Sequence, residues 1–156
     1  MKKVKAIVLD VDGVLTDGGV WWGPNGEEWK RFSFADIMGV SLARKAGLRI
    51  GLISGEDSPL VDRFAAKMGI TDVEKNCKDK AQALRCFAER QSVPLAEICF
   101  MGDDVNDLEA MKIAGLSAAP ASANSAVVNV ASFVSTKTGG NGAVRELIDA
   151  ILAARA

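Results

Sequence analysis

The 156-residue sequence contains no histidine and only three cysteines. The absence of histidine excludes His-based catalytic triads, His zinc ligands and imidazole acid–base catalysis. The cysteines, Cys77, Cys86 and Cys99, are odd in number and form no CxxC motif, so we interpret them as reduced thiols of a cytoplasmic protein. Chemistry in this chain must therefore use carboxylates, lysines, hydroxyls or thiols, together with a hard cation.

A strong net charge and long apolar segments are missing as well. The net charge is -1, which gives no reason to expect a nucleic-acid or membrane partner. No apolar run approaches the length of a membrane span, and the first residues show no signal-peptide pattern. With 49% hydrophobic and 25% charged residues, the composition predicts one globular domain over residues 1–156.

The chain is organised around the stretch from Asp10 to Val14. The apolar run of residues 6–9 is typical of a buried parallel strand, and Asp10 and Asp12 follow it on one side of the extended chain. Gly13 then allows a sharp turn. Paired carboxylates at the end of a strand suit metal binding, nucleophilic attack or acid–base catalysis.

Two other interpretations of this stretch are a calcium-binding loop and a chance acidic turn. A calcium-binding loop counted from Asp10 requires glycine at position 6 and glutamate at position 12, where this chain has Leu15 and Trp21. That interpretation fails. The stretch alone leaves the chance acidic turn open.

Strands and helices are expected to alternate along the chain. The patterns predict strands at 4–9, 48–53, 70–73, 97–101, 116–119 and 133–135, and helices at 36–46, 59–68, 80–91, 108–114, 125–130 and 143–154. Residues 138–142 predict a flexible loop. The alternation indicates an α/β fold with a doubly wound parallel sheet.

A β-hairpin at about 19–33 interrupts this alternation. Asn25-Gly26 is a hairpin turn signal, and all three tryptophans, at 21, 22 and 29, lie in this arm. One ribbon cannot bury three indoles alone, and exposed aromatic patches mark interfaces, so we expect the hairpin to protrude. A hairpin packed on its own domain is the alternative.

Polar residues follow three of the predicted strands. Asp10 and Asp12 follow the first, Ser54 the second, and Asp103 the strand at 97–101. In doubly wound sheets, sites lie at the carboxyl ends of the strands near a switch in strand order. These side chains are therefore expected to gather at one edge of the sheet.

The order of these motifs resembles the haloacid dehalogenase superfamily of phosphatases. The motifs are DxDGV at 10–14, Ser54-Gly55 after a strand, Lys80 at a helix start, and GDDxxD at 102–107. The resemblance covers essentially the whole chain and implies a Rossmann-like fold. Taken singly, each motif has a simpler explanation: a turn serine, a solvated lysine, or a helix N-cap at Asp107.

The resemblance also implies a role for each residue. Asp10 is then the nucleophile that forms an aspartyl-phosphate, and Asp12 is the general acid and base. Mg²⁺ is held by the Asp10 carboxylate, the Asp12 backbone carbonyl and Asp103. Ser54, the Gly55 amide and Lys80 contact the phosphoryl group. The last two carboxylates, of Asp104 and Asp107, order metal-bound waters and Lys80.

No cap domain fits between these motifs, since the segments 12–54 and 54–80 hold only the hairpin and short α/β units. Further motifs at 16–18, 25–28 and 139–146 resemble the capless subgroup that acts on 2-keto-3-deoxy sugar phosphates. That resemblance implies a homotetramer in which each hairpin reaches a neighbouring subunit.

Three residues are candidates for setting specificity: Glu56, Lys67 and Asn106. The 3-deoxy-D-manno-octulosonate 8-phosphate phosphatases carry arginine where this chain has Glu56. The 2-keto-3-deoxynononate 9-phosphate phosphatases carry glutamate there and a lysine that matches Lys67. The resemblance thus favours a nononate phosphate as substrate, with the octulosonate phosphate as the alternative. The simpler explanation of Glu56 and Lys67 is a favourable position at the two ends of a helix dipole.

Two functions from other classes remain as alternatives. One is a non-catalytic oligomerisation module like the domain appended to cytidylyl-sialate synthetases, although such a scaffold has no use for Asp10, Asp12, Lys80 and Asp103. The other is a receiver-type signalling domain. Receivers phosphorylate an aspartate on a middle strand, whereas here the acidic pair ends the first strand and the middle strand ends in Ser54.

Overall fold

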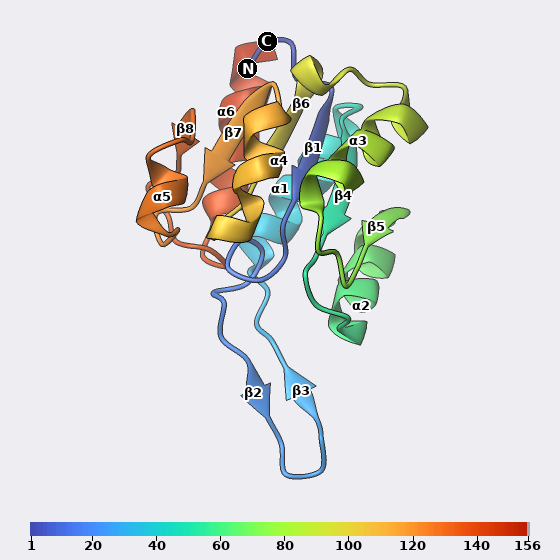
Figure 1. The fold of residues 1–156 in the computed structure, drawn as a ribbon, viewed down its shortest axis with the longest axis vertical. Helices are drawn as coiled ribbons and strands as arrows, with labels where there is room; N and C mark the ends of the chain where they lie inside the picture. The colour runs from blue at the N-terminus through green and yellow to red at the C-terminus, as the bar shows by residue number, and fades with distance from the viewer. Residues whose placement is uncertain (156) are drawn as a thin grey trace.

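A six-stranded parallel sheet runs through the centre of the protein in this computed structural model, which describes residues 1–155 (Figure 1). The strand order is β5-β4-β1-β6-β7-β8. The strands are β1 Ala6–Leu9, β4 Arg49–Ile53, β5 Asp72–Glu74, β6 Ile98–Met101, β7 Leu116–Ala119 and β8 Phe133–Val134. The chain builds outward from β1 in both directions, so the predicted doubly wound sheet is confirmed, with its switch point beside β1.

Helices cover both faces of this sheet. They are α1 Phe34–Lys45, α2 Pro59–Met68, α3 Lys80–Gln91, α4 Leu108–Ile113, α5 Ser125–Val128 and α6 Ala143–Arg155, with 3₁₀ turns η1 Leu95–Glu97 and η2 Val105–Asp107. All six predicted helices and all six predicted sheet strands are present, and only their ends shift. No end shifts by more than about two residues, as at β5, where the pattern predicted a strand at 70–73. No cap domain interrupts the described chain.

Strand β1 separates two apolar cores. Its side chains alternate, so that Ile7 and Leu9 pack with α1, α2 and α6, while Ala6 and Val8 pack with α3, α4 and α5. All four are fully buried, as expected for a central strand covered on both faces. The two cores together fix where β1 ends, and therefore where Asp10 begins.

Asp36, on α1, caps a helix that lies more than one hundred residues away in the chain. Its carboxylate accepts hydrogen bonds from the backbone amides of Gly142, at 3.1 Å, and Arg145, at 2.9 Å, at the start of α6. Only 1% of Asp36 is exposed, so these bonds to a buried charged group contribute about 1.5–3 kcal/mol each to folding. They join α1 to α6 behind the sheet.

The loop at residues 138–142, for which we predicted flexibility, is instead packed under the turn that follows β1. Gly139 and Gly140 are buried, and the Gly140 amide donates to the Val14 carbonyl at 3.0 Å. A Cβ on Gly139 would lie 1.8 Å from the carbonyl oxygen of Gly13. The glycines thus permit close approach between two backbones, and the prediction of flexibility is wrong in this respect.

The hairpin projects away from the domain, as predicted (Figure 1). It consists of β2 Trp21–Trp22 paired antiparallel with β3 Glu28–Trp29. Trp21 is 73% exposed, Trp22 76% and Trp29 53%. Within one chain, the arm therefore leaves its three indoles largely in contact with water. Among residues 1–155, no helix is long and apolar enough to cross a membrane.

Candidate active site

Lys80 lies buried between two aspartates at the carboxyl end of the sheet. Its Nζ is 3.0 Å from Asp10 Oδ1 and 2.7 Å from Asp107 Oδ1. Asp10 directly follows β1, and Lys80 is the first residue of α3, whose N-terminus is capped by the Asp79 side chain. The exposed fractions are 5% for Asp10, 3% for Lys80 and none for Asp107. The simpler explanation of Asp107, that it is only a helix N-cap, is not supported, because its side chain makes no capping bond to α4.

Asp107 holds the loop after β6 as well as Lys80. Its Oδ2 accepts the backbone amides of Asp103, at 2.9 Å, and Asp104, at 3.2 Å. Gly102 precedes this loop, and a Cβ there would lie 2.4 Å from the Asp107 Cβ. Both oxygens of Asp107 thus accept hydrogen bonds, and those of Oδ2 hold the backbone of Asp103 and Asp104 in place.

The cluster contains three carboxylates, those of Asp10, Asp103 and Asp107, but only one ammonium group pairs with them, that of Lys80. Burial raises the pKa of Asp10 well above its usual value, the Asp107 charge adds to this, and Lys80 opposes it. Burial, followed by the charge of Asp107, raises the pKa of Asp103 to about 6. Burial alone would lower the pKa of Lys80, but the charges of Asp10 and Asp107 outweigh it and raise that pKa.

These carboxylates fit a divalent cation. Asp10, Asp103 and Asp107 each place a carboxylate oxygen within 4.8 Å of the others. A hard cation such as Mg²⁺ prefers this donor type, and its charge would oppose the burial and repulsion that raise the pKa values of Asp10 and Asp103. The predicted ligands were the Asp10 carboxylate, the Asp12 backbone carbonyl and Asp103. The observed set of carboxylates contains Asp107 in addition, and it does not contain the carboxylate of Asp12. The Asp12 carbonyl as a ligand stays a prediction.

The Asp12 side chain instead meets a residue of the hairpin that the sequence analysis missed. Lys30 Nζ lies 2.8 Å from Asp12 Oδ1 and 3.6 Å from Glu28 Oε1. The side chain of Lys30 is only 5% exposed, and that of Asp12 is 28% exposed. The one available signal was the alternation along β3, which places Glu28 and Lys30 on the side opposite Trp29.

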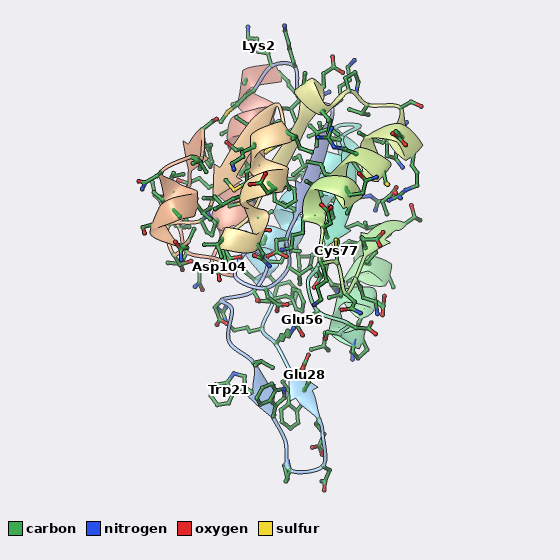
Figure 2. The ribbon with its side chains drawn as sticks, in the orientation of Figure 1. Lys2, Trp21, Glu28, Glu56, Cys77 and Asp104 are labelled. Carbon is green, nitrogen blue, oxygen red and sulfur yellow. The ribbon has the colours of Figure 1, made fainter. Side chains whose placement is uncertain are left out.

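A cavity of about 250 Å³ opens beside the cluster. Its lining includes Asp10, Asp12, Lys80 and Asp103, together with Gly55, Glu56, Asp104 and Asn106. Figure 2 shows Glu56 and Asp104 at the edge of the domain from which the hairpin projects. Residues from all four predicted motifs thus meet at one cavity, and the candidates Glu56 and Asn106 line it.

Within one chain, neither Ser54 nor Lys67 lies where its predicted role requires. Ser54 was expected to contact the phosphoryl group, and Lys67 was a candidate for setting substrate specificity. Ser54 is fully buried, and its Oγ accepts the Glu56 amide at 3.2 Å, so it shapes the loop beneath the cavity. Lys67 lines a separate cavity of about 260 Å³, with Lys30, Arg63 and the stacked rings of Phe32 and Phe64. A substrate contact by Lys67 within its own subunit is therefore not supported.

Comparison with known proteins gives consistent matches. Residues 51–147 match the profile of a haloacid dehalogenase-like hydrolase family. The 3-deoxy-D-manno-octulosonate 8-phosphate phosphatase of Escherichia coli (strain K12) is 34% identical over 154 residues, which are 99% of this chain and 82% of that protein. The same phosphatase from Moraxella catarrhalis, solved with magnesium, phosphate and KDO, superposes with a TM-score of 0.96 at 34% identity, covering 99% and 88% of the two chains. The cobalt-bound Haemophilus influenzae phosphatase gives 0.96 at 35% identity, covering 99% and 90%.

The raised pKa values predict how a divalent cation stabilises this fold. In the metal-free protein, folding retains protons on Asp10 and Asp103 that the unfolded chain releases near pH 4. Their contribution to the free energy of unfolding is therefore greatest below about pH 4. The part from Asp103 is lost as the pH rises through about 6, and the part from Asp10 is lost as the pH rises through its own raised pKa. Because the cation binds the ionised forms, Mg²⁺ should raise the melting temperature more at about pH 7.5 than at about pH 5.

Differential scanning calorimetry with and without Mg²⁺ checks this. At about a hundred times the dissociation constant, the gain near pH 7.5 should be about 5–10 °C. The variant Asp103→Asn should lose most of it. Equal gains at the two pH values, or a full gain in Asp103→Asn, would contradict the assignment of this cluster.

Proposed function

Since the chain belongs to the haloacid dehalogenase-like hydrolases, in the family of the 3-deoxy-D-manno-octulosonate 8-phosphate phosphatases, we propose that it hydrolyses the phosphate ester of a 2-keto-3-deoxy sugar acid with Mg²⁺. The observation that carries this is the buried Asp10–Lys80–Asp107 cluster at a polar cavity. Holding such charges out of water is costly, which favours a catalytic role over a scaffold or a receiver domain.

In the first step, Asp10 attacks phosphorus. A carboxylate oxygen of Asp10 forms a bond to phosphorus while the phosphorus–ester oxygen bond breaks, and the electron pair stays on the departing sugar oxygen. Asp12 gives that oxygen its proton. Lys80, fixed 3.0 Å from Asp10 Oδ1, orients the nucleophile and offsets the negative charge that gathers there.

In the second step, a water molecule hydrolyses the aspartyl-phosphate. The water oxygen bonds to phosphorus, its proton goes to Asp12, and the bond from phosphorus to Asp10 breaks with its electron pair returning to the carboxylate. When bound, Mg²⁺ supplies positive charge against the phosphoryl oxygens. The Gly55 amide and the Lys80 ammonium are the nearby donors for those oxygens, and Asp104 and Asn106 line the same cavity.

For the sugar, the octulosonate 8-phosphate is our first candidate, because the curated relatives named above act on it. The nononate 9-phosphate, which the resemblance of Glu56 favoured, is the second. The observation on its side is that Glu56 lines the cavity and is exposed, where its carboxylate can accept hydrogen bonds from additional sugar hydroxyls. Lys67 could contribute only across a subunit boundary.

We also propose that the protein assembles as a homotetramer through its hairpins. The support is the exposure of Trp21, Trp22 and Trp29 on an arm without a core of its own. A subunit seated there would cover the indoles and restrict access of water to a site that has no cap domain.

The nucleophile is tested by Asp10→Asn. An amide neither attacks phosphorus nor binds Mg²⁺ well, so the variant should lose more than about 4 kcal/mol of transition-state stabilisation while remaining folded. Steady-state hydrolysis of p-nitrophenyl phosphate measures this, with EDTA removing the wild-type activity and added Mg²⁺ restoring it. Activity within tenfold of wild type would refute the role of Asp10.

Substrate preference is tested by comparing kcat/KM for the two keto-deoxy sugar phosphates. We expect Glu56→Arg to shift the ratio toward the octulosonate phosphate by about tenfold, about 1.4 kcal/mol, because the longer sugar loses an acceptor. Glu74→Arg, an exposed acidic residue outside the cavity lining, is the control. An unchanged ratio in Glu56→Arg would show that this residue does not determine specificity.

Light scattering tests the assembly. The wild type should have four times the mass of one chain at micromolar concentration, and Trp21→Ser combined with Trp22→Ser should lower that mass because apolar contact area is lost. Val130→Ser, which changes an exposed apolar residue outside the hairpin, serves as the control. A monomeric wild type would rule out the proposed tetramer.

A further inference from the structure

Lys30, on the hairpin, pairs with a carboxylate that lines the catalytic cavity, that of Asp12. Its ammonium lies 2.8 Å from Asp12 Oδ1, and its side chain is 5% exposed. A lysine in a protruding arm ordinarily extends into solvent, since burying an ammonium is costly without a partner. Here the arm turns this lysine inward onto the carboxylate that exchanges protons with the leaving group and water.

The position of Lys30 is itself fixed from several sides. Glu28 Oε1 lies 3.6 Å from Lys30 Nζ and accepts the hydroxyl of Ser58 at 2.8 Å, where Ser58 caps α2. The indole of Trp22 donates to Glu28 Oε2 at 3.3 Å. Glu28 therefore connects the two strands of the hairpin to the N-terminus of α2. Lys30 connects this network to Asp12. Figure 2 shows Glu28 on the hairpin, between its tip and the domain.

We propose that Lys30 is a positioning residue for the second half of the reaction, an inference that rests on the phosphatase function proposed above. It holds the Asp12 carboxylate toward the cavity during hydrolysis of the aspartyl-phosphate. In that step the water oxygen bonds to phosphorus, the water proton passes to Asp12, and the phosphorus–Asp10 bond breaks with its electron pair returning to Asp10. Without Lys30 the Asp12 carboxylate, 28% exposed, is free to turn away into solvent.

A substrate with a weakly basic leaving group can distinguish a role of Lys30 in positioning Asp12 from a general effect of Lys30 on the structure. p-Nitrophenolate is weakly basic and departs without a proton, so formation of the aspartyl-phosphate from p-nitrophenyl phosphate needs little from Asp12. Hydrolysis of the intermediate needs a base whatever the substrate. A defect confined to Asp12 as base therefore lowers kcat and KM together and leaves kcat/KM for this substrate unchanged.

The experiment compares Lys30→Met and Lys30→Gln with wild type on p-nitrophenyl phosphate, using steady-state and rapid-mixing kinetics. Both variants should show a kcat lowered by about tenfold or more, a KM lowered by a similar factor, and a burst of about one p-nitrophenolate per site. Lys30→Arg keeps a cation opposite Asp12 and should recover most of kcat. The control Lys75→Met removes a lysine that pairs with Asp57 and Asp62, away from Asp12.

Each outcome decides a separate point. An unchanged or raised kcat in both neutral variants would overturn the role of Lys30, and so would a parallel fall of kcat and kcat/KM without a burst in variants that melt like wild type. Using two neutral variants guards against one that fails to fold. A wild type that hydrolyses neither aryl nor sugar phosphates would instead refute the proposed function itself.

Discussion

The Lys80 ammonium, buried between Asp10 and Asp107, is the interaction on which the rest of the site depends. Removing the charged partner from a buried ion pair typically costs about 3–5 kcal/mol, and here the loss of Lys80 would leave both carboxylates uncompensated. The three residues come from the end of β1, the start of α3 and the end of η2. The sheet, the helix cap at Asp79 and the loop after β6 must all be in place before their atoms can meet.

Local patterns predicted the parts of this structure that local forces determine. The buried run of β1, the cap at Asp79 and the GDDxxD loop each carry their signal within a few residues. The strand patterns placed Asp10 and Asp103 at one edge, whereas Lys80 was assigned to the site only through the family resemblance. Lys30 was missed because its inward turn depends on the path of the whole hairpin. The cap that Asp36 provides to α6 was missed for the same reason, since its partners lie 106 and 109 residues away.

The hairpin carries two different environments along its length. Its tryptophans meet water within one chain, whereas Lys30 at its base is nearly inaccessible and pairs with Asp12. Glu28 connects these two environments, because it binds Trp22 on one side and faces Lys30 on the other. A subunit that covered Trp22 would therefore act on Glu28, which is only two contacts away from the Asp12 carboxylate.

The glycine loop beneath the turn after β1 has a consequence for synthesis of the protein. Asp10 and Asp12 leave the ribosome well before the backbone that braces their turn, at Gly139 and Gly140. Until those two glycines emerge, the nascent chain carries both aspartates without that brace. The order of translation thus delays completion of this turn until the segment at 139–140 has been made.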